Sequence, residues 1–421
     1  MEKLIIKGGR RLSGVISISG SKNSTLPILA STILNNNKIT LTNVPIVKDV
    51  ETMTNLLINL GANVKIKKKT HTIQIHNKSK LNTFAPYRLL KTMRAGILVL
   101  GPLLARYQKA KVSLPGGCAI GSRPVNLHLN ALKKMGASFK IKDGYILAIA
   151  PKGLTGSTIN FPKISVGATE NILITACFAQ GKTIIKNCAN EPEIKDLSNF
   201  LVKMGCNIFW KTERCVEVVG ITKLKSVKHK ILFDRIEAGT YIIASILAGD
   251  NVVIKNINPK IIKFEINILK KMGAKILIYK NKVIIKKSNL IKKINLNTKP
   301  YPGFPTDLQA QIMILMCKAN GLSSIRENIF ENRFMHVSEL NRMGADIVIK
   351  GNKAFIRGNV EFNGAEIMAT DLRASVSLVL AGLIAKNTTI INRIYHLDRG
   401  YENLEYKLSK CGANIKRINN A

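Results

Sequence analysis

The sequence predicts an α/β protein of two inside-out barrel domains, each built from three repeated βαβαββ units with helices inside and sheets around them. Three observations lead to this prediction. A short glycine motif recurs six times along the chain, and six helical segments are apolar on almost every side. The length of 421 residues is too great for one ordinary core and suits two domains of about 200 residues.

The recurring motif is an apolar or cysteine residue followed by glycine and then alanine or cysteine. Its glycines are 68 to 75 residues apart, at Gly61, Gly136, Gly205, Gly273, Gly344 and Gly412. A fixed period indicates copies of one supersecondary unit, and glycine suits the left-handed position that ends a helix. A single row of six stacked units is the alternative. It is disfavoured because the ends of the chain are no more polar than its middle.

Each repeat predicts the same order: strand, buried helix, strand, amphipathic helix and two strands. Buried helices are expected at 25–34, 94–104, 169–178, 239–247, 307–316 and 372–384, where apolar residues surround the axis. Amphipathic helices precede the glycines, for example at 125–135 and 261–272. Strands follow them, as at 64–66 and 73–75, and another strand separates the two helices, as at 183–186 or 389–392.

The formal net charge is +40, which invites a nucleic-acid interpretation. We do not expect nucleic-acid binding, because the basic residues are scattered and the chain has one Trp and few aromatic residues for stacking on bases. The charge would still attract anionic small molecules. No apolar run approaches the roughly 18 residues of a membrane helix, and the N-terminus lacks a signal-peptide core. A cytoplasmic protein without a membrane partner is therefore expected.

The seven cysteines are odd in number and never spaced as C-x-x-C, so neither a disulfide framework nor a metal site is expected. Cys118 stands apart from the other six, because it lies in the glycine-rich stretch 114–124 with Arg123 five residues later. A thiol near fixed positive charge can titrate close to neutral pH. A buried structural cysteine is the alternative, but the loop composition favours a chemical role such as proton transfer.

Cations occur where a bare helix would prefer acids. Arg123 and Arg399 share one register of the repeat, thirteen residues before their glycines, at the expected start of an amphipathic helix. Lys22 and Arg94 begin two of the buried helices. A cation at the positive end of a helix is unfavourable unless an anion binds there. The alternative for Lys22 and Arg94 is that they point into water.

Acids open two other buried helices. Thr306, Asp307 and Gln309 have the spacing of a capping box, with Thr306 as the cap and Gln309 reaching back. The proline-rich run 300–305 before them forms a stiff loop that could aim the Asp307 carboxylate into a cleft. Asp371 and Arg373 are expected to form a structural pair. The residues thus predict an anion site with a thiol and a carboxylate nearby, and the chain has no nucleotide-binding glycine motif.

Taken together, the motifs resemble those of the enolpyruvyl transferases, in the same order and over essentially the whole chain. They are the segments 19–23, 91–95, 115–118, 304–307, 330–334, 370–374 and 398–402. The resemblance implies transfer of the enolpyruvyl group of phosphoenolpyruvate to the 3′-hydroxyl of UDP-N-acetylglucosamine, with release of phosphate. That is the first committed step of peptidoglycan synthesis. It also implies a cleft between domains 22–232 and 1–21 plus 233–421, no cofactor and no metal, and a chain expected to be a monomer.

The resemblance also implies roles for single residues. Cys118 resembles the proton donor and Asp307 the group that takes the hydroxyl proton, while Lys22, Arg123 and Arg399 resemble a clamp on phosphate and carboxylate. Contacts to the UDP-sugar or ordering of the cleft are implied for Asn23, Arg94, Arg123, Pro124, Val125, Asn126, Leu127, Lys163, Ile164, Ser165, Val166 and Ile329. Arg333, Asp371 and Arg373 are expected to contact phosphoenolpyruvate or to order its neighbours.

Two positions depart from the family pattern. Asn126 stands where the family usually has Asp, and Asn190 stands where a basic residue is common. Both bear on affinity for the UDP-sugar more than on the type of reaction. The first alternative function is transfer to shikimate 3-phosphate, which the Cys118 loop disfavours. The second, from a different class, is a basic nucleic-acid-binding repeat protein.

Overall fold

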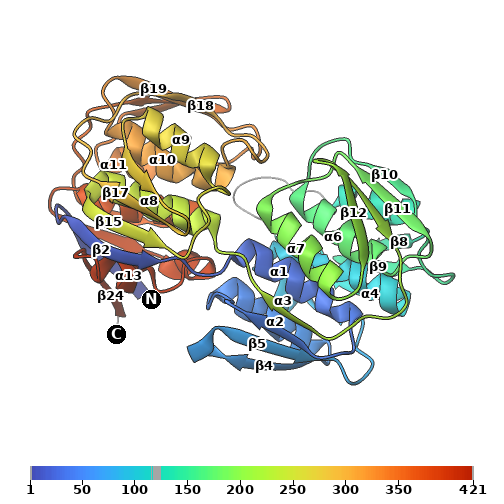
Figure 1. The fold of residues 1–421 in the computed structure, drawn as a ribbon. Coiled ribbons are helices and arrows are strands. Elements are labelled where there is room, and N and C mark those ends of the chain that lie inside the picture. The colour runs from blue at the N-terminus through green and yellow to red at the C-terminus, as the bar shows by residue number, and fades with distance from the viewer. Residues whose placement is uncertain (1, 115, 117–124, 420–421) are drawn as a thin grey trace. The chain divides into compact units, whose positions relative to one another are not determined.

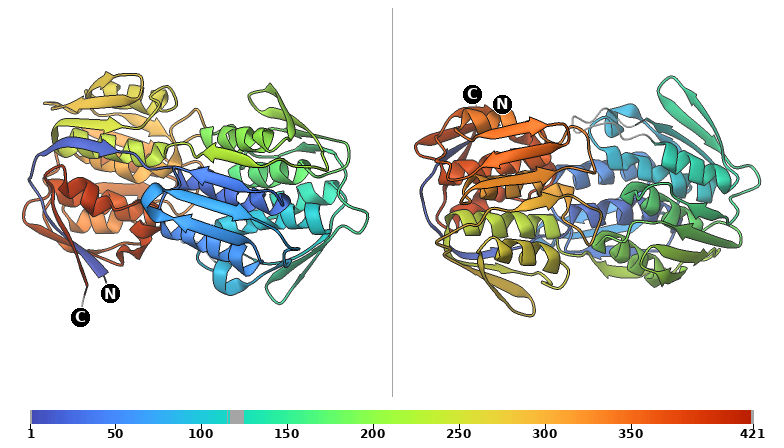
Figure 2. Two further views of the ribbon diagram at one scale, coloured as in Figure 1. Left: turned by 60° about the horizontal axis from the view of Figure 1, so that its bottom comes forward. Right: turned by 90° about the horizontal axis from the view of Figure 1, so that it is seen from above.

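The computed structural model describes residues 2–114, 116 and 125–419 and divides them into two compact units. Among these residues, we call 20–114, 116 and 125–232 the central unit, and 2–19 with 233–419 the terminal unit. Both units contain helices and mixed four-stranded sheets, shown from three directions in Figures 1 and 2. The predicted α/β class is confirmed, and the single row of six units is wrong because the chain forms two bodies.

The central unit carries three sheets. Its strands are β3 (Ile39–Thr42), β4 (Asn63–Lys67), β5 (Thr72–His76), β6 (Phe84–Ala85), β7 (Lys109–Ser113), β8 (Ser138–Lys142), β9 (Tyr145–Ile149), β10 (Thr158–Asn160), β11 (Lys182–Lys186), β12 (Asn207–Thr212), β13 (Cys215–Val219) and β14 (Val227–Lys230). Its helices are α1 (Lys22–Ser31), α2 (Lys48–Asn59), α3 (Tyr87–Leu90), α4 (Leu100–Tyr107), α5 (Asn126–Lys134), α6 (Val166–Ala176) and α7 (Pro192–Lys203), with 3₁₀ turns η1 (Thr32–Leu34), η2 (Lys68–Thr70) and η3 (Arg94–Val99).

The terminal unit repeats this plan. Its strands are β1 (Glu2–Lys7), β2 (Leu12–Ser17), β15 (Gly249–Lys255), β16 (Lys275–Ile278), β17 (Lys282–Lys286), β18 (Asn295–Asn297), β19 (Leu322–Arg326), β20 (Ile347–Lys350), β21 (Lys353–Arg357), β22 (Glu366–Met368), β23 (Thr388–Asn392) and β24 (Asn414–Asn419). Its helices are α8 (Arg235–Ala248), α9 (Lys263–Lys271), α10 (Gln309–Cys317), α11 (Val337–Arg342), α12 (Leu372–Ile384) and α13 (Leu404–Ser409), with 3₁₀ turns η4 (Thr306–Leu308) and η5 (Ile394–Arg399).

The six sheets share one topology, which confirms the predicted repeat. In the order β10-β11-β13-β12, for example, the first pair is parallel and the other two pairs are antiparallel. Three sheets are completed by strands from distant parts of the sequence, one of which is β2, paired in parallel with β15 in the sheet β16-β17-β15-β2. β14 supplies the edge of the sheet β14-β3-β5-β4, and β1 enters β22-β23-β1-β24. The sheets of the described residues are separate, so three sheets, rather than one closed barrel, surround the helices of each unit.

Burial explains why these helices lie inside. Helices α6, α8, α10 and α12 are buried on nearly every side, as their apolar sequences predict, and α8, α10 and α12 pack on one another. The strands instead alternate between buried apolar and more exposed polar residues, as in β11, where Thr183 and Ile185 are buried and Lys182 and Lys186 are exposed. Outer sheet faces therefore carry much of the lysine excess.

The six repeat glycines all adopt the left-handed conformation predicted for them. Their φ angles are 100° at Gly61, 96° at Gly136, 109° at Gly205, 98° at Gly273, 97° at Gly344 and 99° at Gly412. Each follows a helix and turns the chain into the next strand, where a residue with a Cβ would be strained. No helix among the described residues is both long enough and apolar enough to span a membrane.

Candidate active site

In the terminal unit, Asp307 is held between two arginines. Its Oδ1 accepts a hydrogen bond from Nη2 of Arg333 at 2.5 Å, and its Oδ2 accepts one from Nη2 of Arg373 at 3.0 Å. Both arginine side chains are 5% exposed, whereas the Asp307 side chain is 28% exposed. Charge-assisted bonds of this kind are strong and directional, so the two guanidinium groups fix a carboxylate that solvent still reaches.

The capping box predicted at Thr306 is absent from this part of the chain. Residues 306–308 form a 3₁₀ turn without a side-chain cap, and the Thr306 hydroxyl donates to Oε2 of Glu327 at 2.9 Å. Gln309 does not reach back but contacts the Met313 sulfur. The prediction failed because a distant carboxylate, which local spacing cannot reveal, takes the Thr306 hydroxyl.

Glu327 is a buried hydrogen-bonding hub, and no sequence pattern pointed to it. Its carboxylate accepts from the hydroxyls of Thr298 and Thr306 and from the backbone N–H groups of Ile329 and Phe330, at 2.8 to 3.2 Å. Ile329, a predicted UDP-sugar contact, is 37% exposed. Glu327 therefore ties the Ile329 turn to the turn that carries Asp307.

Asp371 and Arg373 are linked through the backbone rather than as an ion pair. The Asp371 carboxylate caps α12 by accepting from the N–H groups of Arg373 at 2.9 Å and Ala374 at 3.1 Å. The Arg373 guanidinium is directed to Asp307 instead. Although burial works against ionisation, the Asp307 charge holds the pKa of Arg373 above its usual value.

In the central unit, Lys22 is buried and paired. It begins α1, where Ser21 accepts from the Ser24 N–H as the helix cap, and the Lys22 side chain is 11% exposed. Its Nζ donates to Oδ2 of Asp49 at 3.1 Å. The alternative that Lys22 points into water is wrong, and Asp49 is a partner that sequence reasoning missed. Asn23, next along α1, is half-buried.

Several predicted UDP-sugar contacts of the central unit lie near His128. Burial first, and then the charge of Arg94, lowers the pKa of His128 to about 4. A Cβ on Gly167, the residue after Val166, would stand 3.5 Å from the His128 ring. His128 lies on α5, two residues after its first residue Asn126, and Val125 directly precedes the helix. Arg94, the start of α5 and the start of α6 therefore lie around His128. Ser165 caps α6 by accepting a hydrogen bond from the Ala168 N–H.

The remaining members of that segment are partly or fully accessible. Lys163 and Val166 are exposed, whereas Ile164 is half-buried. Asn190, where the family pattern differs, is buried just before α7. Near it, burial and the charges of Glu193 and Glu191 hold the pKa of Glu170 well above its usual value. This acidic cluster had no signal in the sequence.

Arg399 does not begin an amphipathic helix, contrary to the sequence prediction. It ends the 3₁₀ turn η5, and α13 starts only at Leu404. The break arises because Asn403 adopts a left-handed conformation with φ 48°, so α13 cannot extend back to Arg399. Arg399 is half-buried, and its charge adds to burial in lowering the pKa of His396.

The predicted site residues Cys118, Arg123 and Pro124 lie outside the described residues. The described residue Gly116 packs against the backbone of Lys91, and a Cβ there would clash with the Lys91 carbonyl. The six described cysteines form no disulfides with one another, and burial raises the pKa of Cys188 to about 11 and of Cys317 to about 12. These thiols are poor nucleophiles, as expected.

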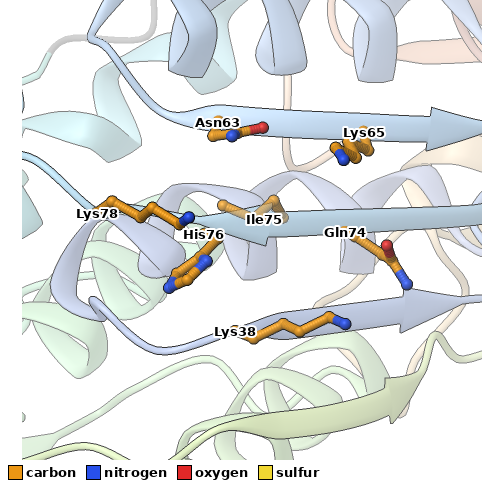
Figure 3. A pocket seen from close by; sticks show the side chains of 7 residues that line it. All are labelled: Lys38, Asn63, Lys65, Gln74, Ile75, His76 and Lys78. Carbon is orange, nitrogen blue, oxygen red and sulfur yellow. The ribbon is translucent and has the colours of Figure 1, made fainter.

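A surface hollow lies on the sheet β14-β3-β5-β4, and its lining residues differ from those of the predicted site. Figure 3 shows its lining, which comprises Lys38, Asn63, Lys65, Gln74, Ile75, His76 and Lys78. None of the predicted site residues contributes to it. Among the described residues, no group of three or more His, Cys, Asp and Glu side chains is placed to hold a metal ion.

Comparison with known proteins identifies the class. A family model described as EPSP synthase (3-phosphoshikimate 1-carboxyvinyltransferase) matches residues 6–408. Two solved structures share the fold over the whole chain: the enolpyruvyl transferase NikO from Streptomyces tendae, with a TM-score of 0.91 and 22% identity over 99% of its length, and EPSP synthase from Acinetobacter baumannii, with a TM-score of 0.76 and 18% identity over its full length. The chain belongs to this enolpyruvyl transferase family.

Within the family, the curated relatives carry a more specific name. The protein of Pelagibacter ubique (strain HTCC1062) is 62% identical over 419 residues and 100% of both chains. That of Rickettsia prowazekii (strain Madrid E) is 51% identical over 99% of this chain and 100% of its own length. Both are named UDP-N-acetylglucosamine 1-carboxyvinyltransferase.

Proposed function

We propose that this chain transfers the enolpyruvyl group of phosphoenolpyruvate to the 3′-hydroxyl of UDP-N-acetylglucosamine and releases phosphate, the first committed step of peptidoglycan synthesis. The observation that carries the proposal is identity of 62% over the full length of a relative with that name. The Asp307 carboxylate, oriented by Arg333 and Arg373 and still partly exposed, supports it from the structure.

The reaction is an addition followed by an elimination. The 3′-oxygen bonds to the central carbon of phosphoenolpyruvate while the methylene carbon gains a proton. Loss of a proton from the resulting methyl group and departure of phosphate then restore the double bond. A base for the hydroxyl proton and an acid for the methylene carbon are both needed.

Asp307 is the proposed acceptor of the hydroxyl proton. A carboxylate has about four acceptor positions, so the two guanidinium bonds do not exhaust its capacity. Cys118 is the proposed donor to the methylene carbon, and it can also add covalently to phosphoenolpyruvate. Fixed charges stabilise the developing charge without reorganisation, which is the proposed contribution of the buried Arg333 and Arg373.

The remaining roles concern binding. Lys22, Arg123 and Arg399 are proposed to bind the phosphate and carboxylate of phosphoenolpyruvate. Asn23, Arg94 and Ile329, with the segments 123–127 and 163–166, are proposed to contact the UDP-sugar. We also propose that the two units correspond to the two expected domains, with residues 20 and 21 assigned to the central one.

The role of Cys118 has a direct test. Cys118→Ser should release phosphate at least about a hundredfold more slowly, because a serine hydroxyl is a much weaker acid than a thiol. An epoxide phosphonate such as fosfomycin should alkylate Cys118, as peptide mass mapping would detect. Alkylation of another cysteine with Cys118 untouched, or full activity of Cys118→Ser, would remove Cys118 from the mechanism.

Phosphate release with two acceptors tests the proposed function as a whole. The purified chain should release phosphate from phosphoenolpyruvate with UDP-N-acetylglucosamine and not with shikimate 3-phosphate. Activity only with shikimate 3-phosphate would assign the chain to the sister enzyme. DNA binding that survives physiological salt, without phosphate release, would instead favour the nucleic-acid alternative.

A further inference from the structure

The hydroxyl of Tyr401 lies where the three inner helices of the terminal unit meet. It is 2.9 Å from Oγ1 of Thr240 on α8, 3.3 Å from Nε2 of Gln311 on α10 and 3.2 Å from Nη1 of Arg373 on α12. Tyr401 is 3% exposed. Its motif stood out in the sequence, yet none of the roles proposed above uses Tyr401.

The donors and acceptors of this cluster can be assigned. Thr240 donates its own proton to the Ile236 carbonyl at 2.8 Å, so Tyr401 must donate to Thr240. Tyr401 then accepts from Arg373 and Gln311, which uses both lone pairs of the phenolic oxygen. Burial raises the pKa of Tyr401 above its usual 10 even though Arg373 and Thr240 lower it, so the hydroxyl keeps the proton that this assignment needs.

Two links connect this hydroxyl to Asp307. The first runs through Arg373, whose Nη1 donates to Tyr401 and whose Nη2 donates to the Asp307 carboxylate. The second runs through Gln311, whose Nε2 also donates to the Asp307 backbone carbonyl at 2.9 Å. The Gln311 amide cannot be reversed without loss, because three acceptors face its nitrogen. Tyr401 therefore braces both the side chain and the backbone of Asp307.

Tyr401 also anchors the segment that carries Arg399. The Tyr401 N–H donates to the Leu397 carbonyl at 2.9 Å, and the Gly400 N–H donates to the same carbonyl at 3.0 Å. The backbone on either side of Arg399 is thereby tied to a side chain whose hydroxyl is fixed among the inner helices. One phenol thus connects two residues that have different proposed roles.

We propose that Tyr401 is a positioning residue for the enolpyruvyl transfer: it holds Arg373 against Asp307 and secures the Arg399 segment. This inference rests on the proposed function. Removing only the hydroxyl should leave the fold intact, since the ring stays packed. The Arg373 guanidinium would keep its bond to the Asp307 carboxylate but lose the Tyr401 hydroxyl as an acceptor. The loss should disturb the positions of the reacting groups, and thus kcat, more than the affinity for the substrates.

Tyr241 offers a matched control for this test. It is a neighbouring residue of Thr240 on α8 and is 1% exposed, and its hydroxyl has no hydrogen-bond partner among the described residues. Tyr401→Phe and Tyr241→Phe therefore delete equally buried hydroxyls, of which only the first contacts Arg373.

The test compares kcat and KM of both variants in the phosphate-release assay. For Tyr401→Phe, kcat should fall roughly tenfold to a hundredfold, the effect of losing a hydrogen bond to a charged group. Both KM values should stay within about threefold, and Tyr241→Phe should keep the wild-type kcat within about twofold. Equal kcat values for the two variants would overturn the proposal, as would a Tyr401→Phe loss confined to KM. If the wild type itself releases no phosphate, the proposed function fails separately.

Crystal structures of the two variants give a second readout that does not depend on turnover. The Arg373–Asp307 contact of 3.0 Å should lengthen or become disordered in Tyr401→Phe and persist in Tyr241→Phe. An unchanged contact in Tyr401→Phe would contradict the positioning role, whatever the assay shows.

Discussion

Asp307 is the described residue on which the proposed chemistry depends most, because its carboxylate is the proposed proton acceptor. Two buried guanidinium groups compensate its charge, and the hydroxyl of Tyr401 and the carboxylate of Glu327 order their surroundings. Such a carboxylate is oriented before any substrate arrives. Preorganisation of this kind lowers the cost of reaching the transition state.

Asp307→Asn should reduce kcat by about a hundredfold to ten-thousandfold, because the amide keeps the shape but cannot take a proton. The melting temperature should fall as well, because the amide leaves one of the two buried guanidinium groups without a charged acceptor. Asp346→Asn is the control, since Asp346 pairs with Arg357 on the surface, where it is 50% exposed. A kcat for Asp307→Asn close to that of the control would exclude Asp307 as the proton acceptor.

The sequence named the proposed site residues but did not reveal the contacts that they make. Asp307, Arg333 and Arg373 were named through motifs, and Lys22 was rightly suspected not to be a surface lysine. Its partner Asp49, the Glu327 hub and the Tyr401 contacts could not be predicted, because they depend on contacts between residues 21 to 161 positions apart. Local rules were misleading at Thr306, where a distant acid displaced the expected cap.

At the scale of elements, the repeat glycines mark where each helix turns into a strand. Gly273 and Gly136 have nearly the same left-handed φ, 98° and 96°. Their surroundings differ, because a Cβ on Gly273 would lie 2.6 Å from the Leu290 carbonyl oxygen, whereas the nearest atoms to one on Gly136 are 3.9 Å away. A side chain at Gly136 would meet only the strain of the left-handed backbone, whereas one at Gly273 would also clash with the Leu290 carbonyl.

Gly136→Ala should cost about 1–2 kcal/mol of unfolding free energy through left-handed strain alone. Gly273→Ala should cost roughly 1–3 kcal/mol more unfolding free energy, because the backbone at Leu290 must also move. Urea unfolding of the two variants measures both values. Equal losses would mean that the Leu290 carbonyl moves aside freely and that φ alone dictates glycine at these ends.

The order of elements was largely predictable because the repeat shows it six times. Apolar composition all round identified the inner helices, and glycine identified the helix ends. The start of α13 was not predictable in this way, since the left-handed Asn403 breaks a helix that the register with Arg123 had extended to Arg399. The pairing of β14 with β3 and of β1 with β23 also left no local pattern, although the family resemblance did imply that residues 1–21 join the second domain.

At the scale of the whole molecule, buried titratable groups link stability to pH. Asn171 fixes His128 as neutral: the Asn171 Oδ1 accepts from the Gly101 N–H, so its Nδ2 must donate to Nδ1 of His128 at 3.0 Å. Burial and Arg94 lower the pKa of His128 from 6.5 to about 4. Between these two pKa values, His128 therefore binds a proton in the unfolded chain but stays neutral in the folded chain.

The lowered pKa of His128 makes the folded state less stable as the pH falls. The contribution of His128 is fully present above pH 6.5 and is lost as pH falls toward about 4. Between about pH 7.5 and 5, His128→Gln should lose about 2 kcal/mol less unfolding free energy than the wild type. His76→Gln, on the outer strand β5, is the control and should follow the wild type. Parallel pH dependence of His128→Gln and the wild type would show that His128 does not resist protonation.

In the proposed reaction, the chain adds the enol of phosphoenolpyruvate to UDP-N-acetylglucosamine and then eliminates phosphate. The most direct test is mass spectrometry and NMR of the product formed in D₂O. The product should be UDP-N-acetylglucosamine bearing one enolpyruvyl group on the 3′-oxygen, with deuterium in its vinyl methylene, because that carbon gains and then loses a proton. A product without deuterium, or no product from UDP-N-acetylglucosamine, would contradict it.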